Sequence, residues 1–215
     1  SAQTSATGLR DIEDRVSRAL IWGAAWDMTR DAEMRTTDYL NMVLGADLGS
    51  IEIGVAQQLL LQARSAIEQF GNPENRAANR DALAASLIEA LAKTEPGSDH
   101  QLAFVKNIAG ISRTKEHIAL IAGWLDGSAT PAGLEVDTDL RWQLVARLVA
   151  LGELAETAID EELERDNTAG GQRQAASARA GIPTAEAKLN AWKAVIEDHN
   201  LANALLESTV GGFSQ

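Results

Sequence analysis

The chain has 215 residues, with 19 Lys and Arg against 31 Asp and Glu, and therefore a formal net charge of −12. Such a charge repels phosphate backbones and anionic lipid surfaces, so we expect neither nucleic acid nor membrane among its partners. Cysteine is absent, which excludes disulfides, thiolate catalysis and cysteine-bound metals, and is typical of a protein of the reducing cytoplasm. No apolar run reaches the length of about 18 residues that a membrane span needs.

Ala and Leu fill the apolar positions, and five Trp, one Tyr and three Phe are the only aromatic residues. Ala and Leu lose little entropy in a helix, whereas the residues that favour strands are scarce. Clusters of Gly, Pro and Asn cut the sequence into segments of about 12 to 25 residues, which is the length of helices. These clusters lie at residues 45–49, 71–73, 95–97, 127–133, 167–171 and 181–183.

The N-terminal half opens with residues 1–8, which we expect to be a disordered or expression-derived tail. In the first predicted helix, Trp22 and Trp26 share one face, and Gly23 would allow a neighbouring helix to approach closely. Asp27 and Arg30 lie on the same helix, close enough in sequence to pair with each other or with other charges.

Apolar residues at spacings of three and four predict further amphipathic helices along the chain. One apolar stripe runs through residues 50–70, and another through residues 140–151. A third is formed by Leu189, Trp192 and Ile196. Ser98, Thr114, Asp137 and Thr184 are candidate N-caps, and Gln101 would complete a capping box with Ser98.

About ten helices joined by short loops predict an all-α protein in which residues 9–215 form a single domain. Antiparallel pairs of this length favour an irregular α-solenoid, a superhelix like those of HEAT and armadillo arrays. No sequence motif repeats, so a compact helical bundle is the competing architecture.

No catalytic or metal site emerges from the motifs. His100, His117 and His199 lie far apart, and none has a second His four residues away, as the zinc motif H-E-x-x-H requires. Phosphate-binding loops and the G-x-S-x-G elbow are absent as well. The acidic residues 160–164 surround Ile159 and Leu163, and we interpret them as the solvated face of a helix.

Several segments, in the same order along the chain, resemble the C-terminal region of the actinobacterial aminopeptidase N family of zinc peptidases. They are residues 17–38, 95–99, 134–142 and 166–192. The similarity runs over nearly the whole chain, and it extends more distantly to the C-terminal domain of endoplasmic-reticulum aminopeptidases.

This resemblance implies a parent metalloexopeptidase of the membrane-alanyl type, whose catalytic domain binds zinc through H-E-x-x-H and a distal Glu and carries a G-x-M-E-N loop. The parent would release N-terminal residues from peptides, and the helical domain would cap the active-site chamber and restrict peptide access. Neither motif occurs here, so the resemblance transfers no catalytic residue, metal ligand or cofactor to this chain. Its implied partners are the catalytic domain of the same polypeptide and the peptide substrate.

Four charged residues in the resembling segments are candidates for contacts at the interdomain or substrate-cavity surface: Asp27, Arg30, Asp139 and Arg141. Arg suits carboxylates and acids suit amines. Salt bridges inside the fold are the alternative for all four. For the chain as a whole, a free-standing acidic scaffold that binds another protein is the alternative function, and an independent helical enzyme is a weaker third.

Overall fold

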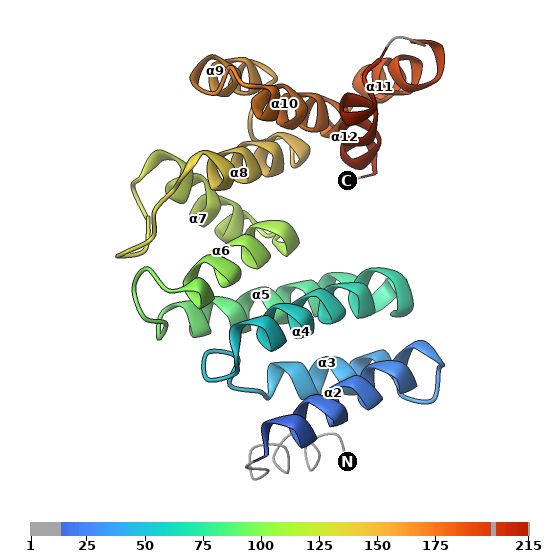
Figure 1. Ribbon diagram of the computed structural model, residues 1–215, viewed down its shortest axis with the longest axis vertical. Coiled ribbons are helices and arrows are strands. Elements are labelled where there is room, and N and C mark those ends of the chain that lie inside the picture. The colour runs from blue at the N-terminus through green and yellow to red at the C-terminus, as the bar shows by residue number, and fades with distance from the viewer. Residues whose placement is uncertain (1–13, 199–200, 215) are drawn as a thin grey trace. The chain divides into compact units, whose positions relative to one another are not determined.

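A computed structural model describes residues 14–198 and 201–214 of the chain (Figure 1). Over these residues the chain forms eleven α-helices and no strand, which confirms the all-α prediction. The predicted tail, residues 1–8, lies outside the described residues. None of the described helices has the length and apolar character needed to cross a bilayer.

The chain divides into two compact units between Thr114 and Lys115. We refer to them as the N-terminal and C-terminal units. The N-terminal unit contains α2 (Arg15–Arg30), α3 (Thr36–Leu44), α4 (Ile53–Ser65), the π-helical turn η1 (Ala66–Phe70), the 3₁₀ turn η2 (Pro73–Asn75), α5 (Arg76–Leu91) and α6 (Asp99–Ile111). The C-terminal unit contains α7 (Lys115–Asp126), α8 (Thr138–Ala150), α9 (Thr157–Arg165), α10 (Ala169–Gly181), α11 (Ala185–Glu197) and α12 (Asn203–Phe213). The superhelical stacking of these helices stays a prediction.

The core of the N-terminal unit centres on Tyr39, which is fully buried on α3. Its hydroxyl donates a 2.6 Å hydrogen bond to Oε1 of Gln62 on α4, and burial raises the pKa of the phenol. The rings of Trp22 and Trp26 both pack against the Tyr39 ring, so the tryptophan face predicted on α2 is confirmed. Gly23 has no heavy atom within 4 Å of its missing Cβ position, so the close approach predicted there is wrong.

The stripe predicted over residues 50–70 is not one α-helix. It begins as α4 and ends in the π-helical turn η1. Gly71 follows this turn, where a Cβ atom would lie 2.8 Å from the carbonyl oxygen of Ala66. A side chain has no room at that position, so Gly71 lets the chain leave the turn.

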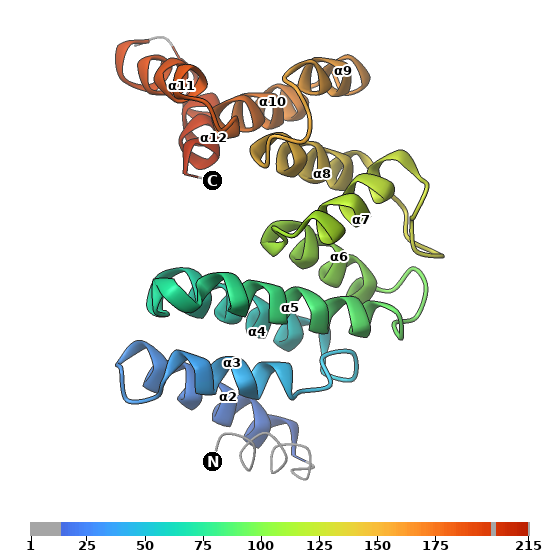
Figure 2. The same ribbon diagram turned by 180° about the vertical axis from the view of Figure 1, so that it is seen from behind.

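Helix α10 lies at the centre of the C-terminal unit, where it contacts α8, α9, α11 and α12 (Figure 2). The core around it contains Trp142, Val145, Val149, Ile159, Ala175 and Ala178. The backbones of α10 and α12 lie very close together, since a Cβ atom on Gly212 of α12 would lie 1.9 Å from the carbonyl oxygen of Ser177 on α10. Only glycine allows the two backbones to come so near.

Side-chain caps start three helices at residues that the sequence predicts, and the cap expected at Thr114 stays a prediction. The side chains of Ser98, Asp137 and Thr184 each accept a hydrogen bond from the backbone N–H three residues on. The Gln101 side chain does not complete the predicted capping box, because its Oε1 accepts from the N–H of Gly97 instead.

Helices α2 and α8 end in the same backbone motif but carry different residues at its left-handed position. After α2, the N–H of Glu33 donates to Met28 O and that of Ala32 to Thr29 O, with φ of +61° at Ala32. After α8, the residue at the equivalent position is Gly152, with φ of +77°. Alanine is strained in this region, whereas glycine is not.

We therefore expect Ala32→Gly to raise the free energy of unfolding by about 1 kcal/mol, and Gly152→Ala to lower it by about the same amount. Urea unfolding of the two variants beside the unmodified chain measures both. The nearest atom to a Cβ on Gly152 is 4.0 Å away, so the Gly152 change tests backbone conformation without a steric clash. Two changes of the same sign would contradict the expectation.

Candidate functional site

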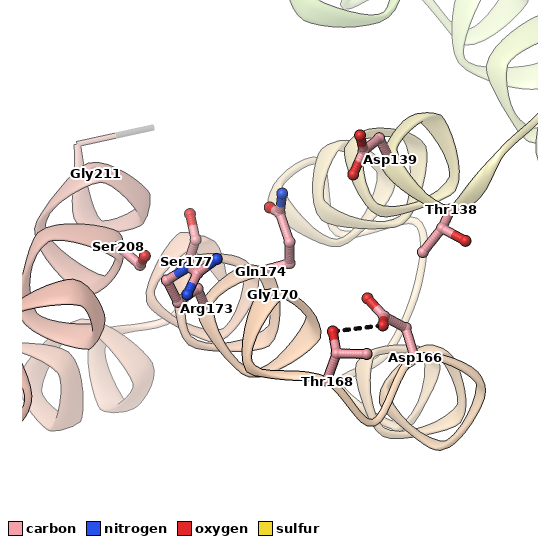
Figure 3. Close-up of a pocket in the computed structure, with 10 residues that line it drawn as sticks. All are labelled: Thr138, Asp139, Asp166, Thr168, Gly170, Arg173, Gln174, Ser177, Ser208 and Gly211. Atoms are coloured by element: carbon pink, nitrogen blue, oxygen red, sulfur yellow. Dashed lines mark hydrogen bonds between the residues drawn. The ribbon is translucent and has the colours of Figure 1, made fainter.

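A polar pocket of about 560 Å³ opens in the C-terminal unit, beside the N-terminal ends of α8 and α10 and the C-terminal half of α12 (Figure 3). Carboxylate, guanidinium, amide and hydroxyl groups make up most of its lining. The lining residues are Thr138, Asp139, Asp166, Thr168, Gly170, Arg173, Gln174, Ser177, Ser208 and Gly211.

Asp166 holds together the wall of the pocket between α9 and α10. Its Oδ2 accepts a 2.8 Å hydrogen bond from the indole N–H of Trp142, and its Oδ1 accepts from the Thr168 hydroxyl at 2.7 Å. Thr168 in turn caps α10, where its Oγ1 accepts from the N–H of Gly171. A Cβ on Gly171 would lie 1.9 Å from the Asp166 carbonyl oxygen, so this turn requires glycine.

Asp139 and Arg173 present charges of opposite sign to the pocket, and neither is engaged in an ion pair within the described residues. The hydroxyls of Ser177 and Ser208 can donate or accept. Together these groups can bind polar ligands with amine, amide or carboxylate groups, with Asp139 accepting and Arg173 donating.

Arg141, two residues after Asp139, makes an ion pair inside the fold. Its guanidinium donates through Nε and Nη2 to the Glu162 carboxylate, at 2.9 and 2.7 Å, and through Nη1 to the Leu125 carbonyl at 3.3 Å. The hydrogen bonds to Glu162 raise the pKa of Arg141, against the opposing effect of lost hydration. The charge of Arg141 is thus held between α8 and α9.

Glu162 is only 4% exposed, so the interpretation of residues 160–164 as a solvated face is wrong at this position. The Glu162 carboxylate can be buried between α9 and α8 because Arg141 of α8 supplies a partner for it. Arg165 adds a second, longer contact at 3.9 Å. Asp160 and Glu161 on the same helix are exposed, as the sequence predicts.

Asp27 and Arg30 form an ion pair at 3.4 Å on the surface of α2, with side chains 63% and 50% exposed. A pair this exposed contributes little to stability, because water screens it. Both groups therefore remain accessible to a further partner. They belong to the N-terminal unit, whereas Asp139 and Arg141 belong to the C-terminal unit.

No group of three or more His, Asp or Glu side chains is arranged to hold a metal ion in residues 14–198 and 201–214. His100 makes a 2.8 Å hydrogen bond with the Ile51 carbonyl, which serves the packing of α6. His199 lies outside the described residues.

Sequence reasoning missed most of the pocket, including Asp166, Thr168 and Arg173. One signal was available. Asp166, Thr168 and the pair Gly170-Gly171 lie within six residues, and Asp, Thr and Gly are typical of a turn that caps a helix. Nothing in the spacing links this turn to Asp139 or Ser208, which reach the pocket from other helices.

The sequence matches the model of the ERAP1-like C-terminal domain family over residues 2–215, and the chain belongs to this family. It is 45% identical over 207 residues to the aminopeptidase N of Streptomyces lividans. That alignment covers 96% of this chain and 24% of the Streptomyces protein, so the chain spans about a quarter of the curated relative's length. The predicted resemblance to actinobacterial aminopeptidase N is confirmed.

We expect Arg141→Ala to destabilise the chain by about 3 kcal/mol, because it leaves the Glu162 carboxylate buried without its main partner. Replacing both residues, by Arg141→Met with Glu162→Leu, should restore most of the lost stability. Urea unfolding followed by tryptophan fluorescence measures each variant, since Trp142 is buried beside this pair. A double variant as unstable as Arg141→Ala would refute the role of the pair.

Proposed function

We propose that this chain is the non-catalytic C-terminal helical domain of a zinc aminopeptidase, and that it caps the active-site chamber and restricts the access of peptides. The parent enzyme would release N-terminal residues from peptides. The observation that carries this proposal is the match to a C-terminal domain family over residues 2–215, together with 45% identity to an aminopeptidase N four times as long. In this proposal zinc is bound by the catalytic part of the polypeptide, outside these 215 residues.

An exposed apolar surface at the end of the C-terminal unit supports a covering partner in the same polypeptide. On α11, Leu189, Trp192 and Ile196 are 51%, 56% and 53% exposed, so the predicted stripe exists but faces outward. Phe213 of α12 continues the surface, since its ring contacts the Trp192 ring. Contiguous apolar patches of this kind mark interaction surfaces. We call this the α11–α12 surface.

The α11–α12 surface is fixed in place by Lys188. Its ammonium donates to the carbonyls of Ala180 and Phe213 and lies 5.2 Å from the centre of the Phe213 ring. Lost hydration lowers the pKa of this lysine. A rigid aromatic surface loses little entropy when a partner covers it, which favours a permanent interface.

The four residues proposed for the interdomain or cavity surface have two different roles, because some can contact a partner directly and one cannot. Asp27, Arg30 and Asp139 have accessible charges and are the candidates for direct contact. Arg141 would act as a positioning residue, because its pair with Glu162 fixes the helix that carries Asp139. The two units would then work as one superhelical domain against the catalytic part.

A free-standing acidic scaffold is the alternative function, and a cytoplasmic location stays a prediction for either. The sequence that precedes residue 1 would distinguish these two functions. An H-E-x-x-H motif some hundreds of residues upstream in the same reading frame supports the peptidase, whereas a nearby start codon supports the scaffold.

We expect Leu189→Asp in the full-length enzyme to raise turnover of a long peptide several-fold relative to a single-residue amide. A buried, unpaired carboxylate weakens an apolar interface, which would loosen the cap without touching the catalytic groups. The measurement is the ratio of the two turnover rates, compared with that of the unmodified enzyme.

Leu61→Asp is the matched control, because Leu61 is 58% exposed on α4 and lies outside the α11–α12 surface. Both substitutions should leave the thermal stability of the isolated 215-residue chain nearly unchanged. An unaltered ratio in the Leu189 variant, or the same change in both variants, would refute the proposed cap.

A further inference from the structure

The pocket of the C-terminal unit is lined by polar residues and glycine, which restricts the ligands that it can hold. Its ten described lining residues include no aromatic ring and no purely hydrocarbon side chain, whereas small-molecule sites in proteins are mostly apolar. Its volume of about 560 Å³ lies in the range of such sites. A ligand of this pocket therefore has to bind through charges and hydrogen bonds rather than through apolar surface.

The charged groups of the pocket are separated along its length. Figure 3 shows the carboxylates of Asp139 and Asp166 toward one end and the side chain of Arg173 toward the other, with Gln174 between them. Two acidic residues and one basic residue give the pocket a net negative charge. A ligand that matches this arrangement has a cation at one end and a carboxylate at the other, together with a second positive group.

Asp166 is held in a fixed orientation at the carboxylate end of the pocket. Its Oδ2 accepts from the indole N–H of Trp142 at 2.8 Å, and its Oδ1 accepts from the Thr168 hydroxyl at 2.7 Å. Each carboxylate oxygen can accept more than one hydrogen bond, so Asp166 can still accept from a cationic group. Its charge also complements the N-terminal end of α10, which leaves little attraction for an anion there.

The guanidinium of Arg173 can bind a carboxylate at the other end of the pocket. It lies over the first turn of α10, where Nη2 is 3.9 Å from the position of a Cβ on Gly170. Arg173 makes no ion pair in the part of the chain that the structure describes. A guanidinium presents a planar pair of donors that matches a carboxylate.

We propose that this pocket binds a free basic amino acid, with its cationic side chain at Asp139 and Asp166 and its carboxylate at Arg173. The hydroxyls of Ser177 and Ser208, which line the pocket on the side of Arg173, would accept from the α-ammonium group. The net positive charge of the ligand would then neutralise the net negative charge of the pocket. This proposal does not rest on the proposed cap, and its test uses this chain alone.

The test measures the dissociation constants of arginine, citrulline and agmatine by isothermal titration calorimetry of the 215-residue chain. Citrulline has the shape of arginine without the side-chain charge, and agmatine is arginine without the carboxylate. We expect saturable binding of arginine and binding about tenfold weaker for each analogue, because each lacks one charge-assisted interaction. Equal affinity for arginine and either analogue, or no saturable binding of arginine, would overturn the proposal.

Two variants assign each end of the ligand to its residue. Asp139→Asn should weaken the binding of arginine about tenfold and leave that of citrulline unchanged, since citrulline has no cation at this end. Arg173→Gln should weaken the binding of arginine to a similar extent and leave that of agmatine unchanged. Both residues are exposed and make no ion pair in the described part of the chain, so neither variant should disturb the fold.

Glu161→Gln is the matched control, because it removes a carboxylate from the exposed face of α9, outside the pocket. It should leave the affinity for arginine unchanged. Unchanged arginine affinity in either pocket variant, or an equal loss in the control, would overturn the assignment.

A second measurement uses the unmodified chain and needs no variant to fold. The indole N–H of Trp142 donates to Asp166, so its NMR resonance should move as arginine saturates the pocket. The indole N–H resonance of Trp124, which is buried on α7 and does not line the pocket, should stay in place. An unmoved Trp142 resonance at saturating arginine would overturn the proposal on its own.

Discussion

The C-terminal unit depends on the small side chains of α10, because one helix can contact four others only if its surface lets them approach. Ala175, Ala178 and Ala180 are buried on it, and Gly171 is buried near its start. The partner contributes as well, since Gly212 brings α12 against the backbone of Ser177. Small residues let these backbones approach, while the large side chains of Trp142, Val145 and Ile159 fill the core around α10. The polar pocket lies beside α10, which lines it together with residues of α8 and α12.

Local sequence signals predicted the helices well, because caps and turns act within a few residues. Asp137 and Thr184 begin helices as the sequence indicates. Partners distant in sequence were not predictable in the same way. The spacing of Leu189, Trp192 and Ile196 defines a helix face, but not what that face contacts. The exposure of this stripe follows from the position of α11 at the edge of the unit, which local periodicity does not encode.

The acidic helix α9 shows the same limit for charge. Its sequence is that of a solvated helix, yet Glu162 is buried because Arg141, 21 residues earlier, supplies donors for both carboxylate oxygens. A lone buried carboxylate would be strongly unfavourable, and the pair makes the burial possible. Two charges in the first turn of α8, two residues apart and therefore on different faces of the helix, have different environments. Asp139 faces the pocket, whereas Arg141 holds α8 to α9.

Ion pairs between elements distant in sequence also occur in the N-terminal unit. Arg80 on α5 donates through Nε and Nη2 to the two carboxylate oxygens of Glu68 on η1, as Arg141 does to Glu162. The Glu68 side chain is 36% exposed, whereas that of Glu162 is 4% exposed. A carboxylate that keeps more of its hydration loses less when its partner is removed, so the Arg80 pair contributes less to stability than the Arg141 pair.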